Sequence, residues 1–155
     1  MLFRSHTLIE KPLASDAASA ARIRDAFAGT GLVAAVGHVE RFNPALREMK
    51  RRLDAGALGR LFAIKTRRVG PYPLRIRDVG VVKDLATHDI DLVMWLGGRF
   101  TAMAAQMAHR LGNPHEDLVE VLGRLDHDVV ATISDRKSTR LNSSHSQQSR
   151  MPSSA

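Results

Sequence analysis

Residues 81–96, VVKDLATHDIDLVMWL, are the stretch that decides the fold. At helical spacing, its apolar side chains cover most of the circumference of a helix. We therefore predict a helix that is buried on most sides and ends at the glycine pair that follows it. Four other side chains fall within one arc of about 60°: Asp84, His88, Asp91 and Trp95. This stripe must face a cleft, a partner or solvent.

Asp84 and His88 are four residues apart, so their side chains can meet on one face of the helix. A carboxylate beside an imidazole raises the pKa of the imidazole and fixes its tautomer, which suits a general acid or base near neutral pH. A solvated polar stripe explains the same spacing. A metal site that also uses Asp91 is a weaker alternative, because one helix rarely supplies three ligands, and we expect no metal.

Upstream of this helix, the pattern is strand, helix, strand. Residues 7–9 are apolar and β-prone, and the strand should end before Pro12, which cannot donate to a ladder. Residues 16–28 are alanine-rich with helical periodicity, with Ser15 as the expected N-cap. Residues 32–36 indicate a buried strand.

Glu10, Lys11 and Pro12 follow the first predicted strand, at the end where α/β sheets bind ligands. A lysine there can orient a cofactor and lower the pKa of a nearby acid; an exposed Glu–Lys pair before a turn is the alternative. Residues 29–34, GTGLVA, fit the dinucleotide-binding pattern only formally, because they close a helix and precede a strand. We interpret these glycines as a C-cap and a turn.

Downstream of residue 36, the order of the predicted strands and helices changes from the α/β class towards the α+β class. Asn43 and Pro44 predict the start of a second helix that runs to about residue 55. The last two strands should form a hairpin across residues 126–128. The predicted strands cover residues 61–69, 100–109, 117–125 and 129–134.

A loop rich in proline and arginine, residues 70–80, separates the first of these strands from the helix at 81–96. Arg75 and Arg77 point the same way in an extended chain and could grip a diphosphate with forked hydrogen bonds. They could equally pair with Asp78 or face solvent. Arg67 and Arg68 precede the loop.

The composition excludes several classes of protein. The 155 residues suit one domain, and no apolar run reaches the length of about 18 residues that a membrane span needs. The chain has no cysteine, which excludes disulfides and thiolate zinc sites and fits a cytoplasmic protein. The net charge is +7, of which residues 135–155 contribute +3. The basic residues lack interleaved aromatics, so we expect neither a nucleic-acid nor a membrane partner.

The composition changes abruptly at residue 135, where the chain becomes rich in Ser, Arg, Gln and Asn. Residues 135–145 and 149–155 match, in the correct order, the translation of two pieces of an indexed short-read sequencing adapter. We therefore expect residues 135–155 to be a non-native, disordered tail. A natural disordered C-terminus is the alternative.

Three motifs together resemble the Gfo/Idh/MocA oxidoreductases: EKPLA at 10–14, GHVERFNPAL at 37–46 and DVGVVKDLATHDIDL at 78–92. The resemblance covers about residues 8–134, in the family's order and spacing. It looks most like the UDP-N-acetylglucosamine 3-dehydrogenase branch. It implies that residues 1–36 end a Rossmann domain and that residues 37–134 are part of a catalytic domain with an open mixed sheet and helices on one face.

The resemblance implies NAD or NADP as cofactor and a sugar or UDP-sugar as substrate. His88 would take the proton of a sugar hydroxyl, Lys11 would bridge cofactor and substrate across an often cis Lys–Pro peptide, and Asp84 would orient His88 or the hydroxyl. The cofactor contacts are expected from Glu10, Lys11, Pro12 and Arg41, and the substrate contacts from Arg75, Arg77 and Asp91. A non-catalytic sugar- or nucleotide-binding relative is the alternative.

The family's glycine-rich phosphate loop is expected upstream of Met1, and its later sheet strands are expected after residue 134. We therefore expect a half cofactor site, a sheet with exposed edges and no turnover by the chain alone. Homo-oligomerisation through the open sheet is a further expectation from the family.

Overall fold

The computed structural model describes residues 5–71, 79–112 and 114–138. The residues expected to grip a diphosphate, Arg75 and Arg77, lie outside the described residues, as do Asp78 and residues 139–155. None of the described helices is long and apolar enough to cross a bilayer.

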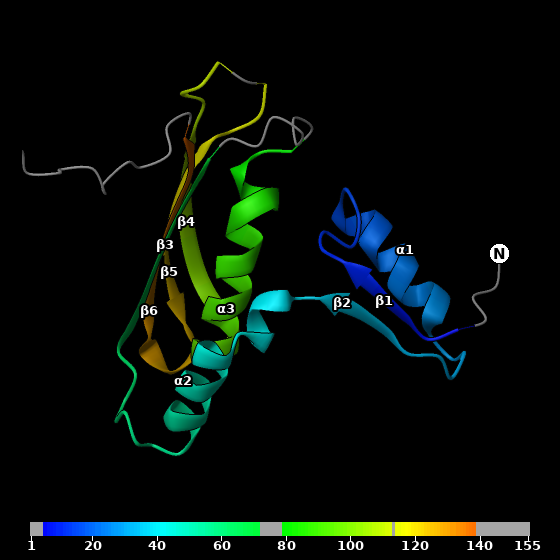
Figure 1. Ribbon diagram of the computed structural model, residues 1–155, viewed down its shortest axis with the longest axis horizontal. Coiled ribbons are helices and arrows are strands. Elements are labelled where there is room, and N and C mark those ends of the chain that lie inside the picture. The colour runs from blue at the N-terminus through cyan, green and yellow to red at the C-terminus, as the bar shows by residue number, and fades with distance from the viewer. Residues whose placement is uncertain (1–4, 72–78, 113, 139–155) are drawn as a thin grey trace, which may run out of the picture.

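The N-terminal part of the chain is a strand–helix–strand unit (Figure 1). β1 (Thr7–Glu10) pairs in parallel with β2 (Ala34–Gly37), and α1 (Ala17–Phe27) connects them. The N-cap is Asp16 and not the predicted Ser15. Its carboxylate accepts from Ser19 N at 2.7 Å, while the Ser15 hydroxyl contacts the same carboxylate instead of the helix.

The second helix begins where the sequence predicts. A short 3-10 helix, η1 (Val39–Phe42), leads into α2 (Pro44–Asp54). The Asn43 side chain accepts from Ala45 N at 3.0 Å, and Pro44 occupies the first position, where its missing N–H costs nothing.

The second sheet is mixed, with strand order β3-β6-β5-β4. β3 runs parallel to β6, while β5 is antiparallel to both of its neighbours, β6 and β4. The turn η3 (Asp126–Asp128) makes the predicted hairpin, with positive φ of 59° and 63° at its last two residues. The strands are β3 (Ala63–Pro71), β4 (Phe100–Ala108), β5 (Leu118–Leu125) and β6 (Val130–Ser138).

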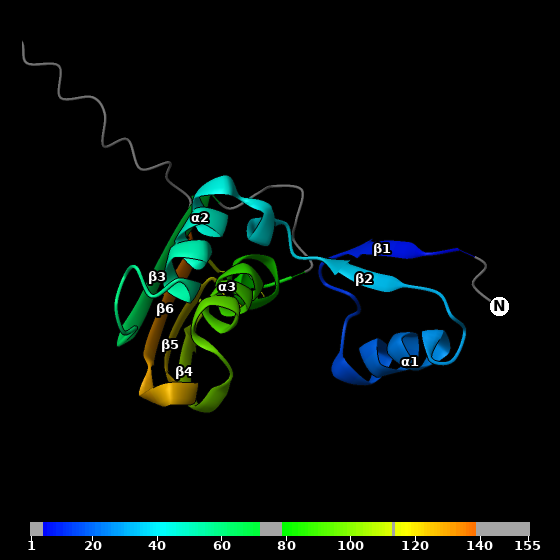
Figure 2. The ribbon, with the colours of Figure 1, turned by 90° about the horizontal axis from the view of Figure 1, so that it is seen from below.

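The helices α2 and α3 (Thr87–Gly97) lie on one face of this sheet (Figures 1 and 2). Alternate residues of β5 and β6 point to that face and form the core with the helix, which fits the predicted fold class. On the other face, Leu122 and Val130 remain 58% and 40% exposed. The core includes Val81, Val93, Val119, Val121, Leu125, Ala131 and Ile133.

The helix predicted over residues 81–96 begins with a π-helical turn, η2 (Val82–Ala86), before it continues as α3. Thr87 N–H reaches back five residues to the carbonyl of Val82. The wider turn means that the spacing of 100° per residue does not hold at Asp84. Such turns are frequent at functional sites.

β6 extends four residues beyond Ser134, so the expected disorder from residue 135 onward is wrong for residues 135–138. These residues continue the ladders with β3 and β5. A backbone ladder can form whatever the side chains are, which a prediction from composition does not consider. Two of the added residues, Asp135 and Lys137, are buried.

Candidate active site

Lys11 and Asp84 meet where the end of β1 faces the π-helical turn. The Lys11 ammonium donates to the main-chain carbonyl of Asp84 at 2.5 Å and lies 4.0 Å from the carboxylate oxygen Oδ1. The Lys11–Pro12 peptide is cis, as the resemblance implies. Glu10 and Pro12, on either side of Lys11, are exposed at the same edge of the two-stranded sheet.

The Asp84 carboxylate is held by two lysines. Lys137 Nζ lies 3.1 Å from Asp84 Oδ2 and also donates to the Val79 carbonyl at 3.0 Å. Its side chain is fully buried. Lys137 is not among the predicted site residues, because the composition of residues 135–155 predicts a non-native tail.

His88 is half-buried one turn after Asp84, and burial lowers its pKa below the ordinary value of 6.5. The positive charges of Lys11 and Arg68 lower the pKa further, while Glu40 and Asp89 raise it more weakly. The predicted rise of this pKa through Asp84 is therefore wrong, since that carboxylate is engaged by lysines. Within the described part of the chain, the His88 ring has no hydrogen-bond partner.

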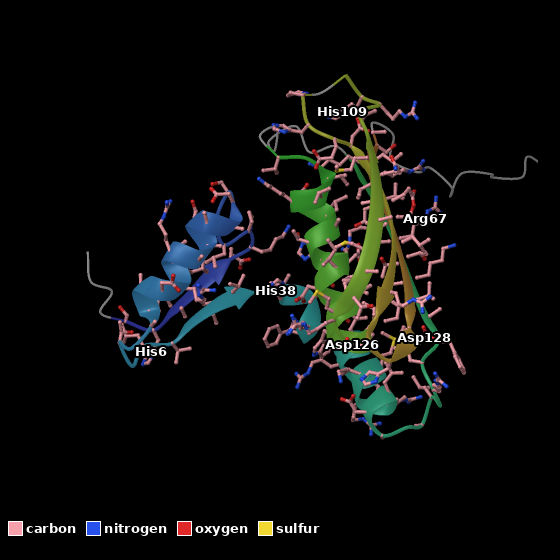
Figure 3. The ribbon with its side chains drawn as sticks, turned by 180° about the vertical axis from the view of Figure 1, so that it is seen from behind. His6, His38, Arg67, His109, Asp126 and Asp128 are labelled. Atoms are coloured by element: carbon pink, nitrogen blue, oxygen red, sulfur yellow. The ribbon has the colours of Figure 1, made fainter. Side chains whose placement is uncertain are left out.

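Arg41 and Asp91, expected at the cofactor and the substrate, bind each other. Arg41 Nε lies 2.8 Å from Asp91 Oδ2, and its Nη2 lies 2.5 Å from Oδ1. His38 Nδ1 approaches the same carboxylate at 3.4 Å. Figure 3 shows His38 where the chain passes from β2 towards η1. This cluster ties η1 to α3.

A second cluster is centred on Arg68 of β3. Its Nε lies 2.9 Å from Asp89 Oδ2, and its Nη1 lies 3.0 Å from Glu40 Oε1. Neither carboxylate is among the site residues predicted from the sequence. Asp89 could have been found, because a carboxylate on the apolar side of a helix is almost always paired when it is buried.

Two apolar cavities among the described residues include none of these side chains. An apolar cavity of about 650 Å³ separates α2 from β3 and α3, and contains none of the predicted site residues. Another, of about 520 Å³, lies between α1 and the two-stranded sheet.

Residues 46–148 match the model of the GFO/IDH/MocA C-terminal domain. The chain belongs to the GFO/IDH/MocA family. This membership confirms the resemblance inferred from the three sequence motifs.

Two curated members of this family show what the chain is similar to. Myo-inositol dehydrogenase Hyg17 from Streptomyces leeuwenhoekii is 33% identical over 138 residues, which are 83% of this chain and 42% of that protein. The scyllo-inositol 2-dehydrogenase (NAD(+)) from Bacillus subtilis is 31% identical over 126 residues, which are 79% of this chain and 36% of that protein. The chain thus spans about two fifths of the length of these relatives.

A solved structure in the family has a similar fold. UDP-N-acetylglucosamine 3-dehydrogenase GnnA from Acidithiobacillus ferrooxidans superposes with a TM-score of 0.74 and 27% identity, and the match covers 87% of this chain and 42% of that one. The relatives therefore include both inositol and nucleotide-sugar dehydrogenases.

Proposed function

We propose that this chain is part of an NAD(P)-dependent dehydrogenase that transfers hydride between a sugar or nucleotide-sugar hydroxyl and the cofactor. The observation that carries the proposal is the meeting of Lys11 with the turn of Asp84, one turn before a half-buried His88 whose pKa is lowered. Lowering that pKa keeps the imidazole neutral near pH 7, as a general base requires.

The residues at this edge fit a dinucleotide. β1 and β2 are parallel, and their carboxyl ends bring Glu10, Lys11 and Pro12 beside Gly37. A Cβ at Gly37 would lie 3.3 Å from the Glu10 carboxylate, so the glycine leaves room for the Glu10 side chain. Ligands of α/β sheets bind at such carboxyl ends. The nicotinamide, when bound, would accept or donate the hydride.

The roles of the side chains follow from their charges. Neutral His88 takes the proton of the substrate hydroxyl, and the Lys11 ammonium stabilises the negative charge that develops on that oxygen. Asp84 orients Lys11 through the contact at 4.0 Å. Arg41 is proposed at the cofactor, and Asp91, Arg75 and Arg77 are proposed at the substrate.

The finer features of the whole protein are also proposals. The names of the relatives support an inositol or a UDP-sugar as substrate. The exposed face around Leu122 and Val130 supports a homo-oligomer, because contiguous exposed apolar surface marks interaction sites. We propose that residues 1–36 end the dinucleotide-binding domain, that residues 37–134 belong to the substrate domain, and that the protein works in the cytoplasm.

A chimera tests the proposed activity. Residues 5–138 replace the matching segment of the Acidithiobacillus ferrooxidans enzyme, and NAD(P) reduction is measured with UDP-N-acetylglucosamine and with myo-inositol. We expect turnover with one of them, and a loss of about 100-fold or more in kcat for Lys11→Met. The control Lys65→Met changes an exposed lysine of β3 and should leave kcat unchanged.

Two outcomes would contradict the proposal. A folded chimera that binds the cofactor without turnover would favour a non-catalytic binding role. A Lys11→Met chimera with full kcat would remove Lys11 from the reaction.

A further inference from the structure

Arg68 joins three elements beside His88. Its guanidinium, on β3, lies 2.9 Å from Asp89 Oδ2 on α3 and 3.0 Å from Glu40 Oε1 on η1. Its main-chain N–H donates to Asp135 Oδ1 of β6 at 3.0 Å. Asp89 is only 6% exposed, so its contact with Arg68 is shielded from solvent. The cluster is therefore a partly buried network that links three elements, and not an isolated ion pair on the surface.

The cluster adjoins His88, because Asp89 is the next residue of α3. The charged groups that act on the imidazole come from different elements, two of them positive and two negative: Lys11 after β1, Arg68 on β3, Glu40 on η1 and Asp89 on α3. The neighbouring charges of Asp84 and Asp91 are already paired with Lys11, Lys137 and Arg41. The balance around His88 therefore depends on whether Glu40 and Asp89 are neutralised.

We propose that Arg68 is a positioning residue that, by binding both Glu40 and Asp89, offsets most of the negative charge with which these carboxylates would favour a protonated His88, and so helps to hold the imidazole in its neutral form. The guanidinium does this in two ways. It compensates both negative charges through hydrogen bonds, and it adds a positive charge of its own that disfavours an imidazolium. The importance of Arg68 for catalysis rests on the proposed function, but its effect on the protonation of His88 does not.

The test is an NMR titration of His88 in the whole 155-residue chain, with its signal assigned by comparison with His88→Asn. Arg68→Met should raise the pKa of His88 by about one unit, because a cation is lost and two carboxylates are left unpaired. Arg67→Met is the matched control. Arg67 is the preceding residue of β3, is exposed and points to the other face of the sheet (Figure 3), so it should leave the pKa unchanged.

A second variant covers the case in which Arg68→Met does not fold, as judged by far-UV circular dichroism. Glu40→Gln keeps an acceptor for Arg68 but removes a negative charge, so it should lower the pKa of His88 by a few tenths of a unit. An unchanged or raised pKa in Glu40→Gln would overturn the proposal, as would an unchanged pKa in a folded Arg68→Met.

These results are distinguishable from a failure of the proposed function. If His88 titrates as expected but the chimera has no dehydrogenase activity, the charge cluster stands and the enzyme assignment fails. If the chimera is active but the pKa of His88 is the same in Arg68→Met and Glu40→Gln as in the parent chain, the enzyme assignment stands and Arg68 has only a structural role.

Discussion

Asp135 is an acidic residue whose surroundings disfavour its negative charge. It is fully buried, and among the described residues its Oδ2 has no hydrogen-bond partner. Burial, followed by the nearby carboxylate of Asp89, raises the pKa of Asp135 to about 7. Both causes favour the protonated form of Asp135, because a negative charge is costly when it is buried beside another carboxylate.

This shift predicts that the chain loses stability as the pH rises. The folded-state pKa of about 7 lies above the ordinary value of 3.8, so the contribution of Asp135 is complete below pH 3.8 and is lost as the pH rises through 7. The loss is on the order of 1 kcal/mol per pH unit within that window. Urea unfolding at pH 5 and pH 8 should therefore show a drop in the free energy of unfolding.

Asp135→Asn should remove most of that drop and stabilise the chain at pH 8. The control is Asp128→Asn, which alters an exposed carboxylate paired with Arg124 at the surface and should change little. Equal pH dependence in the parent chain and in Asp135→Asn would rule out the buried proton.

The helix that carries Asp84 and His88 depends on a cap supplied by another segment. Glu116 accepts from Val82 N with its carboxylate at 3.1 Å and from Val81 N with its carbonyl at 2.8 Å. These contacts satisfy donors that the first turn cannot pair internally. Gly80 makes room for them, since a Cβ there would lie 1.9 Å from the Glu116 carboxylate.

Gly80→Ala should therefore displace the Glu116 side chain and destabilise the start of this helix by roughly 1–2 kcal/mol, as the loss of a cap does. Thermal unfolding measures the effect. Gly70→Ala is the control, because a Cβ at Gly70 would meet only Leu85 Cδ1 at an ordinary 3.7 Å. A Gly80→Ala chain as stable as the control would show that the cap contributes little.

Local chemistry explains which elements could be predicted. The start of α2 was predicted to the residue, because Asn43 and Pro44 act on the turn that they precede. The π-helical turn and the last four residues of β6 were not predicted, because both depend on contacts with distant segments. The Glu116 cap and the ladder to β3 have no signal in the local sequence.

At the scale of the whole molecule, the proposed site lies where the strand–helix–strand unit meets the helix of the second sheet. Two lysines tie these parts: Lys11 binds the Asp84 carbonyl, and Lys83 donates to the Ser15 carbonyl at 2.8 Å. Lys11 and Asp84 are 73 residues apart in the chain. Motifs predict the proposed site residues individually, but the lowered pKa of His88 depends on burial and on the charges of Lys11 and Arg68, which only the fold brings near.

The most direct test of the central claim, that His88 is the base of a dehydrogenase, is the pH profile of kcat/KM in the chimera. We predict that kcat/KM falls as the pH drops through a midpoint below 6.5, because the pKa of His88 is lowered and only the neutral imidazole accepts a proton. His88→Asn should abolish this acidic limb and reduce kcat/KM by about 100-fold or more, while the exposed His109→Asn should leave both unchanged. An acidic limb and a rate that survive in His88→Asn would contradict the account.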